Sequence, residues 1–306
     1  MTVPGAGTDW RTETQAVADG IRRRVLDHVL RNNGGYMSQA CSSAEIFSML
    51  YTKVLRLGPS TAPPVPRSFG GVPGAPGTEF FNGGEYNGPR EPRFDRFIFS
   101  PSHYALVLYA ALIEVGRLAP DGLEQFNQDG STVEMIGAEH SPGVETTTGS
   151  LAQALSQAGG IALARKLHGD SGNVWVMMSD GEFQEGQIWE AIETISRYNL
   201  DNLRVIVDVN GQQCDGCLDE IESGDPLTHK IRAFGASAVE ADGHDLDALE
   251  LAMTAQTGKP HFVLARTDPV HGLPIFGDRA PLLHYLRFTS EEERARYQAA
   301  YEEMVV

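Results

Sequence analysis

Four short apolar runs are the feature of this sequence that most restricts its fold. They lie at residues 97–99, 174–178, 205–207 and 262–264, and each has the length of a β-strand. Stretches with helical periodicity separate them, at residues 104–115, 150–168, 186–198 and 246–257. Strands that are apolar throughout and alternate with helices are typical of a covered parallel sheet. We therefore predict an α/β fold, a parallel sheet with helices on both faces.

The flanking regions of the chain predict further helices. Residues 12–31 carry apolar side chains at helical spacing, and the Asn and Gly residues at 32–35 provide the stop. A second helix is expected to follow Ser42 and Ser43. Near the end, the Thr-Ser-Glu-Glu-Glu sequence at residues 289–293 has the pattern of a capping box and predicts a terminal helix to about Met304. The chain has no internal repeat, and we interpret residues 1–306 as a single domain.

A segment rich in Pro and Gly, at about residues 57–93, interrupts this pattern. It has the composition of a loop and is predicted to be an excursion without regular structure. Loops of this length in a compact domain are uncommon and are often functional. A binding lid and a tolerated insertion are both compatible with the sequence.

The charge balance and the cysteine content exclude several classes of protein. Lys and Arg number 24 against 41 Asp and Glu, a net charge of −17 without a basic stripe, so we expect no nucleic acid partner. No apolar run is long enough for a membrane helix, and the first residues lack the pattern of a signal peptide. We expect a soluble, cytoplasmic protein. Cys214 and Cys217 lack the second ligand pair of a zinc site, and we interpret them as packing residues.

Polar residues follow two of the apolar runs, where ligands of a parallel sheet are expected. The run at 174–178 is followed by Ser-Asp-Gly-Glu, with Asp180 and Gly181, and the run at 205–207 is followed by Asp-Val-Asn-Gly, with Asn210. Adjacent parallel strands would bring Asp180 and Asn210 together as oxygen ligands for Mg²⁺ or Ca²⁺. Gly181 would allow the backbone to pass close to a bulky anion. An ordinary turn is the alternative interpretation of Asp-Gly.

The sequence around these residues resembles the transketolase family, whose thiamin diphosphate motif includes the Asp-Gly and the Asn. The matching stretches are Ser-Asp-Gly-Glu-Phe-Gln-Glu-Gly at 179–186, Leu-Asp-Asn-Leu at 200–203 and Gln-Gln-Cys-Asp-Gly at 212–216. Two earlier segments also agree, Asp-Arg-Phe-Ile-Phe-Ser-Pro-Ser-His at 95–103 and Pro-Gly-Val-Glu-Thr-Thr-Thr-Gly-Ser-Leu at 142–151. The pyruvate dehydrogenase alpha type matches less well, because it lacks Leu-Asp-Asn-Leu. The resemblance implies the thiamin diphosphate-binding fold.

The resemblance also implies a set of cofactor ligands. Asp180 and Asn210 correspond to side-chain ligands of Mg²⁺, and Gln212 to the residue that offers a backbone carbonyl. Gly181 corresponds to a neighbour of the diphosphate, and Gly149 to a contact of the aminopyrimidine. Two neighbours of these motif positions, Leu151 and Glu182, are also expected to belong to the cofactor site.

Further positions have implied roles in catalysis and assembly. His103 corresponds to a catalytic and cofactor-binding histidine, although a packed histidine at a helix start is the alternative. His271 is matched to a late catalytic histidine of the family. Glu185 and Glu190 correspond to acidic residues at the family's subunit interface, with a solvated acidic face as the alternative.

The sequence departs from the family at positions that would face the sugar. Ser179 replaces the usual Gly before the motif Asp, a small change. Tyr36 stands where the family has a histidine after two glycines, and the family's Gly-His-Pro segment is shortened here to residues 137–142. His140 lies in this segment in a different register. The usual phosphosugar donor is therefore in question, while cofactor binding is not.

The family's second domain supplies a Glu that activates the cofactor, and this sequence has no counterpart to that domain. We therefore expect the amino-terminal subunit of a split transketolase, with a partner subunit that carries the activating Glu, in an α₂β₂ assembly. The expected reaction transfers a two-carbon ketol unit from a ketose to a carbonyl acceptor. There are two alternatives: one component of a thiamin-dependent 2-oxoacid synthase or acyltransferase, and a non-catalytic regulatory subunit that binds thiamin diphosphate.

Overall fold

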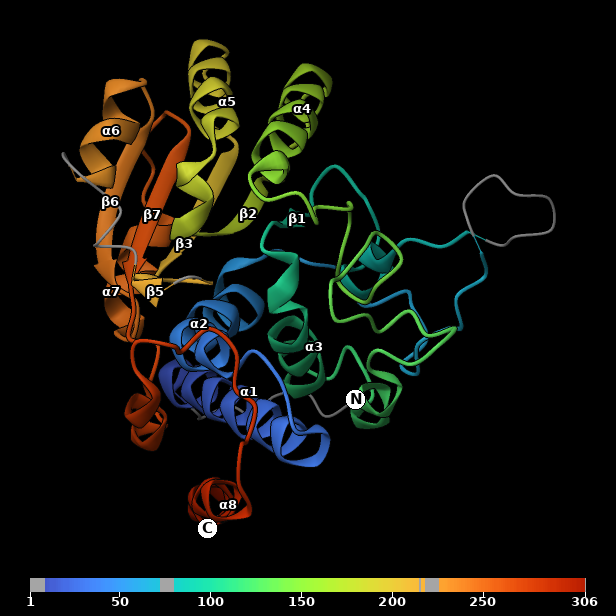
Figure 1. Cartoon of the computed structure of the whole chain (residues 1–306). Coiled ribbons are helices and arrows are strands. Elements are labelled where there is room, and N and C mark those ends of the chain that lie inside the picture. The colour runs from blue at the N-terminus through green and yellow to red at the C-terminus, as the bar shows by residue number, and fades with distance from the viewer. Residues whose placement is uncertain (1–8, 72–79, 215, 218–225, 306) are drawn as a thin grey trace.

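The computed structural model of the chain contains a parallel sheet between two layers of helices (Figure 1). It describes residues 9–71, 80–214, 216–217 and 226–305. Five strands, all parallel to their neighbours, form the sheet in the order β1 (Arg96–Phe99), β2 (Val174–Ser179), β3 (Leu203–Val209), β7 (His261–Arg266) and β6 (Ser237–Asp242). The predicted α/β class, with a parallel sheet and helices on both faces, is confirmed.

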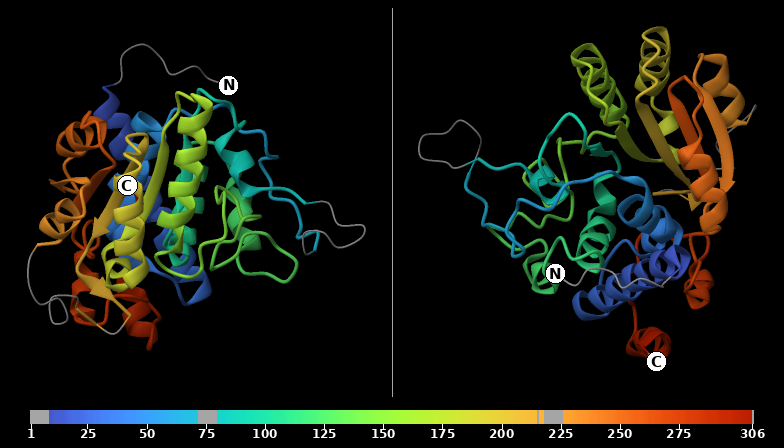
Figure 2. Two further views of the ribbon diagram at one scale, coloured as in Figure 1. Left: turned by 90° about the horizontal axis from the view of Figure 1, so that it is seen from above. Right: turned by 180° about the vertical axis from the view of Figure 1, so that it is seen from behind.

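Helices cover both faces of the sheet, as the views in Figures 1 and 2 show. One layer consists of α4 (Gln153–His168), α5 (Gly186–Arg197) and α6 (Leu227–Ala233), and the other contains α1 (Trp10–Asn32), α2 (Met37–Met49), α3 (Ala105–Glu114) and α7 (Leu246–Thr254). Alternate residues of β2 enter the two resulting cores. Trp175 and Met177 pack with α1 to α3, whereas Val176 and Met178 pack with α4 and α5. A strand buried on both faces is apolar throughout for this reason.

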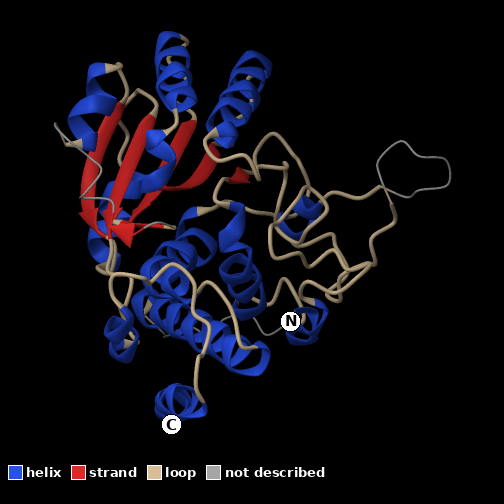
Figure 3. Cartoon of the chain, viewed as in Figure 1, coloured by secondary structure: helices blue, strands red, loops and turns tan. Residues whose placement is uncertain are grey.

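The remaining regular elements are short, apart from the last helix (Figure 3). A π-helical turn extends α2, and single 3₁₀ turns precede α3, follow β2 and lie in the long connections; their bounds are Leu50–Val54, Gly83–Asn87, Ser102–Tyr104, Pro120–Gln125, Asp180–Gln184 and Pro274–Arg279. A two-residue hairpin joins β4 (Gln212–Gln213) to β5 (Gly216–Cys217). The helix α8 (Glu291–Val305) begins at the predicted place, where the Ser290 hydroxyl accepts a hydrogen bond from the Glu293 backbone N–H.

Two elements differ from the sequence-based expectation. The helix α2 begins at Met37, so Ser42 and Ser43 lie inside it instead of capping it. Their hydroxyls donate to buried acceptors, that of Ser43 to the carbonyl of Gln39 at 2.5 Å and that of Ser42 to the carboxylate of Asp208 at 2.6 Å. The strand β6 was not expected, because it lies at the edge of the sheet and alternates buried with more exposed residues instead of forming an apolar run.

The Pro- and Gly-rich segment follows the expectation of a loop in the part that the structure describes. Apart from one 3₁₀ turn it has no helix, and it packs against α3 and the connection before α4. Arg117 donates to the carbonyls of Gly58 and Tyr86 at 3.1 and 2.8 Å, and the Asn87 side chain donates to the carbonyl of Gly143 at 3.2 Å. Part of this segment, residues 72–79, lies outside the described residues. Within the described ranges, no helix has both the length and the hydropathy needed to span a bilayer.

Candidate active site

A cavity of about 280 Å³ opens at the carboxyl ends of β2 and β3. Six of the residues expected from the sequence line it: His103, Leu151, Gly181, Glu185, Asn210 and Gln212. Gln39, Tyr104 and His284, which were not expected there, line it as well. The cavity therefore lies where ligands of a parallel α/β sheet are expected, and it collects side chains from distant parts of the chain.

The register of the two central strands brings Asp180 to Asn210. Ser179 pairs with Asp208, so the residues that follow β2 and β3 leave the sheet side by side. The carboxylate of Asp180 is 1% exposed, and it accepts hydrogen bonds at 2.8 Å from the backbone N–H of Gly181 and from that of Gly211. The Asn210 Oδ1 atom accepts from the Gln212 backbone N–H at 2.9 Å. The expected meeting of Asp180 and Asn210 thus has a structural basis in the sheet register.

The donors around this cavity fit a divalent cation that carries an anion. Carboxylate and amide oxygens are hard ligands of the kind that Mg²⁺ prefers. Among the described residues that line the cavity there is no Lys or Arg, so a diphosphate beside Asp180 would need a cation to offset its charge. A Cβ atom added to Gly181 would meet no other atom within 4 Å. The backbone is therefore open to a bulky group at this point.

Glu182 has a different role in the structure from the cofactor contact expected. Its side chain is fully buried and accepts hydrogen bonds from the hydroxyl of Ser100, the backbone N–H of Ala152 at 2.8 Å, and the backbone N–H of Ser179 at 2.9 Å. Burial raises the pKa of this carboxyl group, against the opposing effect of these donors. Both oxygens are engaged with protein donors, so Glu182 joins three segments around the cavity and does not line it.

Two imidazoles and a phenol form an aromatic cluster at the cavity. The ring centroids of His103 and His284 are 5.3 Å apart, and the Tyr36 ring lies 5.5 Å from each of them in an edge-on arrangement. Burial lowers the pKa of His103 to about 3, with a smaller contribution from His284, and burial also lowers the pKa of His284. Both imidazoles are therefore neutral at physiological pH, and each can donate or accept a proton in a hydrogen bond.

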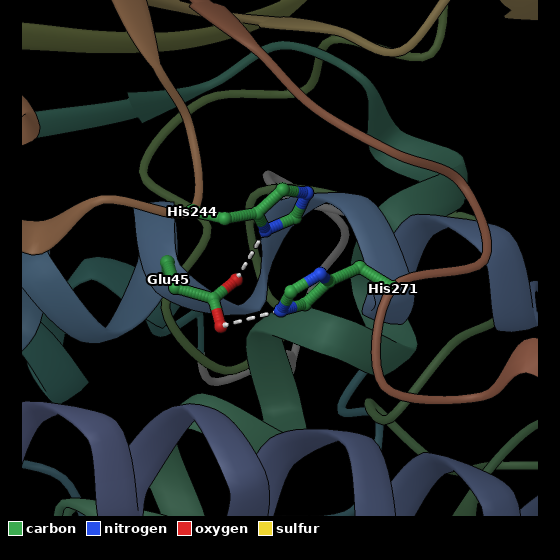
Figure 4. Close-up of side chains that lie close together, drawn as sticks. All are labelled: Glu45, His244 and His271. Atoms are coloured by element: carbon green, nitrogen blue, oxygen red, sulfur yellow. Dashed lines mark hydrogen bonds and ion pairs between the residues drawn. The ribbon is translucent and has the colours of Figure 1, made fainter.

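The late histidine at the cavity is His284, which corrects the expectation for His271. The Nε2 atom of His271 lies 3.9 Å from Oε1 of Glu45, and its ring stacks on that of His244 with centroids 3.8 Å apart (Figure 4). His271 is absent from the lining of the cavity, whereas His284 faces His103 and Tyr36 across it. The sequence-based choice relied on a local Val-His-Gly match. No local motif marks His284; its only signal is a second histidine in the same connection.

The Glu45, His244 and His271 cluster has the composition of a metal site, but its hydrogen bonds favour another role. The Asp268 backbone N–H donates to Nε2 of His244 at 2.8 Å, so the proton of the neutral ring lies on Nδ1. That Nδ1 atom lies 3.0 Å from Oε2 of Glu45, to which Arg22 also donates. A metal ion would have to replace both donors. The cluster is therefore a buried hydrogen-bonded ion pair that ties α1 and α2 to the ends of β6 and β7.

The two acidic residues expected at a subunit interface are exposed. Glu185 lies at the rim of the cavity, and Glu190 lies on α5 beside a groove that α4 and α5 form. Gly149 is packed loosely, since an added Cβ atom would lie 3.8 Å from Ile136 and 3.9 Å from Ser102. Roles for these three residues remain proposals.

Comparisons with known proteins agree with this geometry. Residues 75–279 match the protein family described as "Transketolase, thiamine diphosphate binding domain". An uncharacterized transketolase family protein, y4mO of Sinorhizobium fredii, is 34% identical over 282 residues, which cover 88% of this chain and 90% of the relative. An apulose-4-phosphate transketolase subunit of Actinobacillus succinogenes is 32% identical over 289 residues, which cover 92% and 94%.

Longer transketolases match over part of their length. Human transketolase-like protein 2 is 31% identical over 265 residues, which cover 85% of this chain and 38% of that protein. The crystal structure of the transketolase of Campylobacter jejuni superposes with a TM-score of 0.67 at 21% identity, covering all of this chain and 48% of that one. A Pichia stipitis transketolase with sedoheptulose 7-phosphate gives 0.69 at 22% identity, covering 96% and 44%. At this identity the superpositions show a shared fold.

With a parallel sheet between two helical layers and its polar cavity at the carboxyl ends of β2 and β3, the chain is an α/β domain of the thiamin diphosphate-binding class. The extent and identity of the matches define the family further. The chain belongs to the transketolase family, and it corresponds to the amino-terminal, thiamin diphosphate-binding subunit of a split transketolase, as do the relatives that it matches over nearly their whole length.

Proposed function

We propose that this chain is the Mg²⁺- and thiamin diphosphate-binding subunit of a two-component transketolase. In the proposed reaction, a two-carbon ketol unit moves from a ketose donor to a carbonyl acceptor. The observation that carries the proposal is the meeting of Asp180 with the Asn210 turn beside an open Gly181, in a cavity without a described Lys or Arg. Such a site suits a diphosphate that brings its own divalent cation.

The residues have separable roles in this proposal. The side chains of Asp180 and Asn210 and the backbone carbonyl of Gln212 hold Mg²⁺, and Gly181 leaves space for the diphosphate. Leu151, which is 39% exposed at the cavity, and the neighbouring Gly149 offer an apolar surface to the aminopyrimidine. Bound thiamin diphosphate supplies the nucleophile and electron sink that ketol transfer requires.

The two neutral imidazoles act on the substrate side of the cavity. With a pKa of about 3, His103 stays uncharged and can donate a hydrogen bond to a sugar oxygen or accept a proton from it. His284 is held by Gln39, whose Nε2 atom lies 3.3 Å from its Nδ1 atom and 3.3 Å from its carbonyl oxygen. A histidine pair held in this way can orient the hydroxyl and carbonyl groups of a ketose without adding charge.

A partner subunit completes the proposed enzyme. It would supply the Glu that activates the cofactor and would cover the cavity from the side where Glu185 lies exposed. Glu185 and Glu190 are the proposed contacts to other chains, in an α₂β₂ assembly. The names of two relatives support the arrangement, since each is one subunit of a transketolase, the first for apulose 4-phosphate and the second for 6-deoxy-6-sulfo-D-fructose.

A component of a 2-oxoacid synthase or acyltransferase is the second candidate. The observation in its favour is Tyr36, because the phenol occupies the cluster with His103 and His284 in place of an imidazole. A non-catalytic binding subunit is less well supported, since Asp180, Gly181 and Asn210 keep the geometry of a binding site.

The deciding experiment is to co-purify the chain with the product of a neighbouring gene that encodes the missing domain. The pair is then assayed with thiamin diphosphate and Mg²⁺ against ketose phosphates and 2-oxoacids. Ketol transfer from a ketose supports the proposal. Release of CO₂ from 2-oxoacids as the sole reaction supports the second candidate, and cofactor binding without turnover of either class supports the binding subunit.

A further inference from the structure

Asp208 is a buried carboxylate in the third strand whose partners are all uncharged. Its side chain is 0% exposed. The Oδ2 atom accepts hydrogen bonds from the hydroxyl of Ser42 at 2.6 Å, the hydroxyl of Tyr104 at 3.0 Å and the side-chain amide of Asn210 at 3.0 Å. The Oδ1 atom accepts from the hydroxyl of Thr267 at 2.5 Å. A charged group in a strand buried along its whole length is costly, and its retention calls for a reason.

The bond to Asn210 supplies a reason. An Asn side chain has nearly the same shape with its oxygen and nitrogen exchanged, so its neighbours decide which atom faces the ligand. Ser42 and Tyr104, whose hydroxyls lie 3.4 and 3.1 Å from the amide nitrogen, can donate or accept and therefore do not decide. An ionised carboxylate only accepts. Asp208 therefore requires the nitrogen of Asn210 on its side, and the oxygen must lie on the opposite edge of the amide.

The opposite edge is where a ligand oxygen is needed. The Oδ1 atom of Asn210 accepts from the Gln212 backbone N–H at 2.9 Å, and Asn210 lines the cavity. A backbone N–H only donates, so the two neighbours impose the same orientation from opposite sides. Thr267 and Ser42 hold Asp208 from the end of β7 and from α2, so the acceptor itself is fixed.

We propose that Asp208 is a positioning residue for the metal site: it holds the Asn210 amide with its oxygen toward the cation, and its negative charge strengthens the site for divalent ions. This inference rests on the proposed function, because it assumes that Mg²⁺ and thiamin diphosphate bind beside Asn210. It adds a requirement for a residue that touches neither. Outer partners of metal ligands typically contribute about 10- to 100-fold to metal affinity.

The test compares wild type with Asp208→Asn and with Thr267→Val, a control that removes one donor to Asp208 without touching Asn210. Thiamin diphosphate binding to the chain, with its partner subunit present, is measured by calorimetry across a range of MgCl₂ concentrations. Thermal unfolding without cofactor gives the structural effect of each change. We expect Asp208→Asn to raise the half-saturating Mg²⁺ concentration about 10- to 100-fold, with cofactor binding restored at saturating Mg²⁺.

The outcomes separate the two proposals. If wild type binds and Asp208→Asn has the same Mg²⁺ dependence, or if saturating Mg²⁺ fails to restore binding, the positioning role is wrong and the proposed function stands. If wild type itself shows no Mg²⁺-dependent binding, the proposed function fails first. Should Asp208→Asn not fold, Tyr104→Phe removes one hydroxyl from the same cluster. A several-fold rise in half-saturating Mg²⁺ is then expected, and an unchanged value contradicts the inference.

Discussion

The carboxylate of Asp180 accepts a hydrogen bond from the backbone N–H of Gly211, at a distance of 2.8 Å. This bond crosses from the exit of β2 to the exit of β3. It follows from the parallel register, in which Ser179 is paired with Asp208. The protein therefore holds the two loops together by its own contacts, and Asp180 serves the structure of the site as well as any ligand.

Replacement of Asp180 by Ala is expected to abolish Mg²⁺-dependent binding of thiamin diphosphate. The change removes the proposed metal ligand and the acceptor for Gly211 together. Calorimetry of the chain with its partner, with and without a chelator, measures the effect. Asp201→Ala is the matched control, because that carboxylate is exposed and pairs with Lys166 at the surface. Binding by Asp180→Ala equal to that of wild type would reject the assignment of Asp180.

Much of this fold could be predicted because its central strands are buried on both faces. All residues of β2 and β3 are buried, so each strand appears as an apolar run that ends at a polar residue. The proximity of Asp180 and Asn210 followed from the same pattern, since parallel strands end at one edge. The edge strand β6 was missed because its exposed face is polar, as in Glu240 and Asp242.

The residues that the sequence did not assign depend on tertiary contacts. His284 reaches His103 through a long connection after β7, and no local spacing identifies it over His271. Ser42 was interpreted as a helix cap, yet its hydroxyl donates to Asp208 in the interior of the sheet. Asp208 itself gave one signal, a carboxylate beside an apolar run, which the motif Asn two residues later obscured.

The isolated chain is expected to be inactive with any ketose. The proposed activating Glu belongs to the partner, and without it the bound cofactor is not activated at a useful rate. Steady-state assays of the chain alone, of the partner alone and of the mixture provide the measurement, and turnover should appear only in the mixture. A partner with its Glu replaced by Gln is the control for simple stabilisation. Multiple turnovers by the chain alone would overturn the split-enzyme proposal.

Glu45→Gln is expected to destabilise the fold by roughly 3 kcal/mol or more, because it leaves the buried Arg22 without its anion. Burial alone would raise the pKa of Glu45, but hydrogen bonds from His244 and Arg22 outweigh it and lower the pKa to about 2. The stabilisation is therefore complete above the ordinary value of 4.5 and is lost as the pH falls toward about 2.

Denaturant unfolding of wild type and Glu45→Gln, at neutral pH and at about pH 3, measures this contribution. The difference in unfolding free energy should shrink at the lower pH, where Glu45 of the unfolded wild type is protonated. Arg31→Gln is the control, because its pair with Asp27 lies at the surface and is worth at most about 0.5 kcal/mol. A difference that stays constant with pH would contradict the assigned pKa.

Substrate choice is expected to differ from ordinary pentose phosphate interconversion, and Tyr36 is the reason. The phenol packs against His103, His284 and Tyr285, with ring centroids 5.0 Å apart in the last pair. Burial raises the pKa of Tyr36, so its hydroxyl stays protonated and uncharged. A site that hydrogen-bonds a sugar discriminates through the partners that its polar groups require. Exchanging an imidazole for a larger phenol changes both the donor and the space beside the substrate.

We therefore expect the reconstituted pair to prefer a larger or less phosphorylated acceptor. Its kcat/KM for xylulose 5-phosphate with ribose 5-phosphate should lie below the roughly 10⁴ to 10⁸ M⁻¹s⁻¹ of ordinary enzymes. Tyr36→His should raise this value, because it restores a compact donor beside His103, whereas Tyr36→Phe keeps the ring and should not. Steady-state kinetics of the three proteins make the comparison. A wild-type value within the ordinary range would make standard transketolase activity the better account, and an equal effect of both variants would show that the phenol acts only through its size.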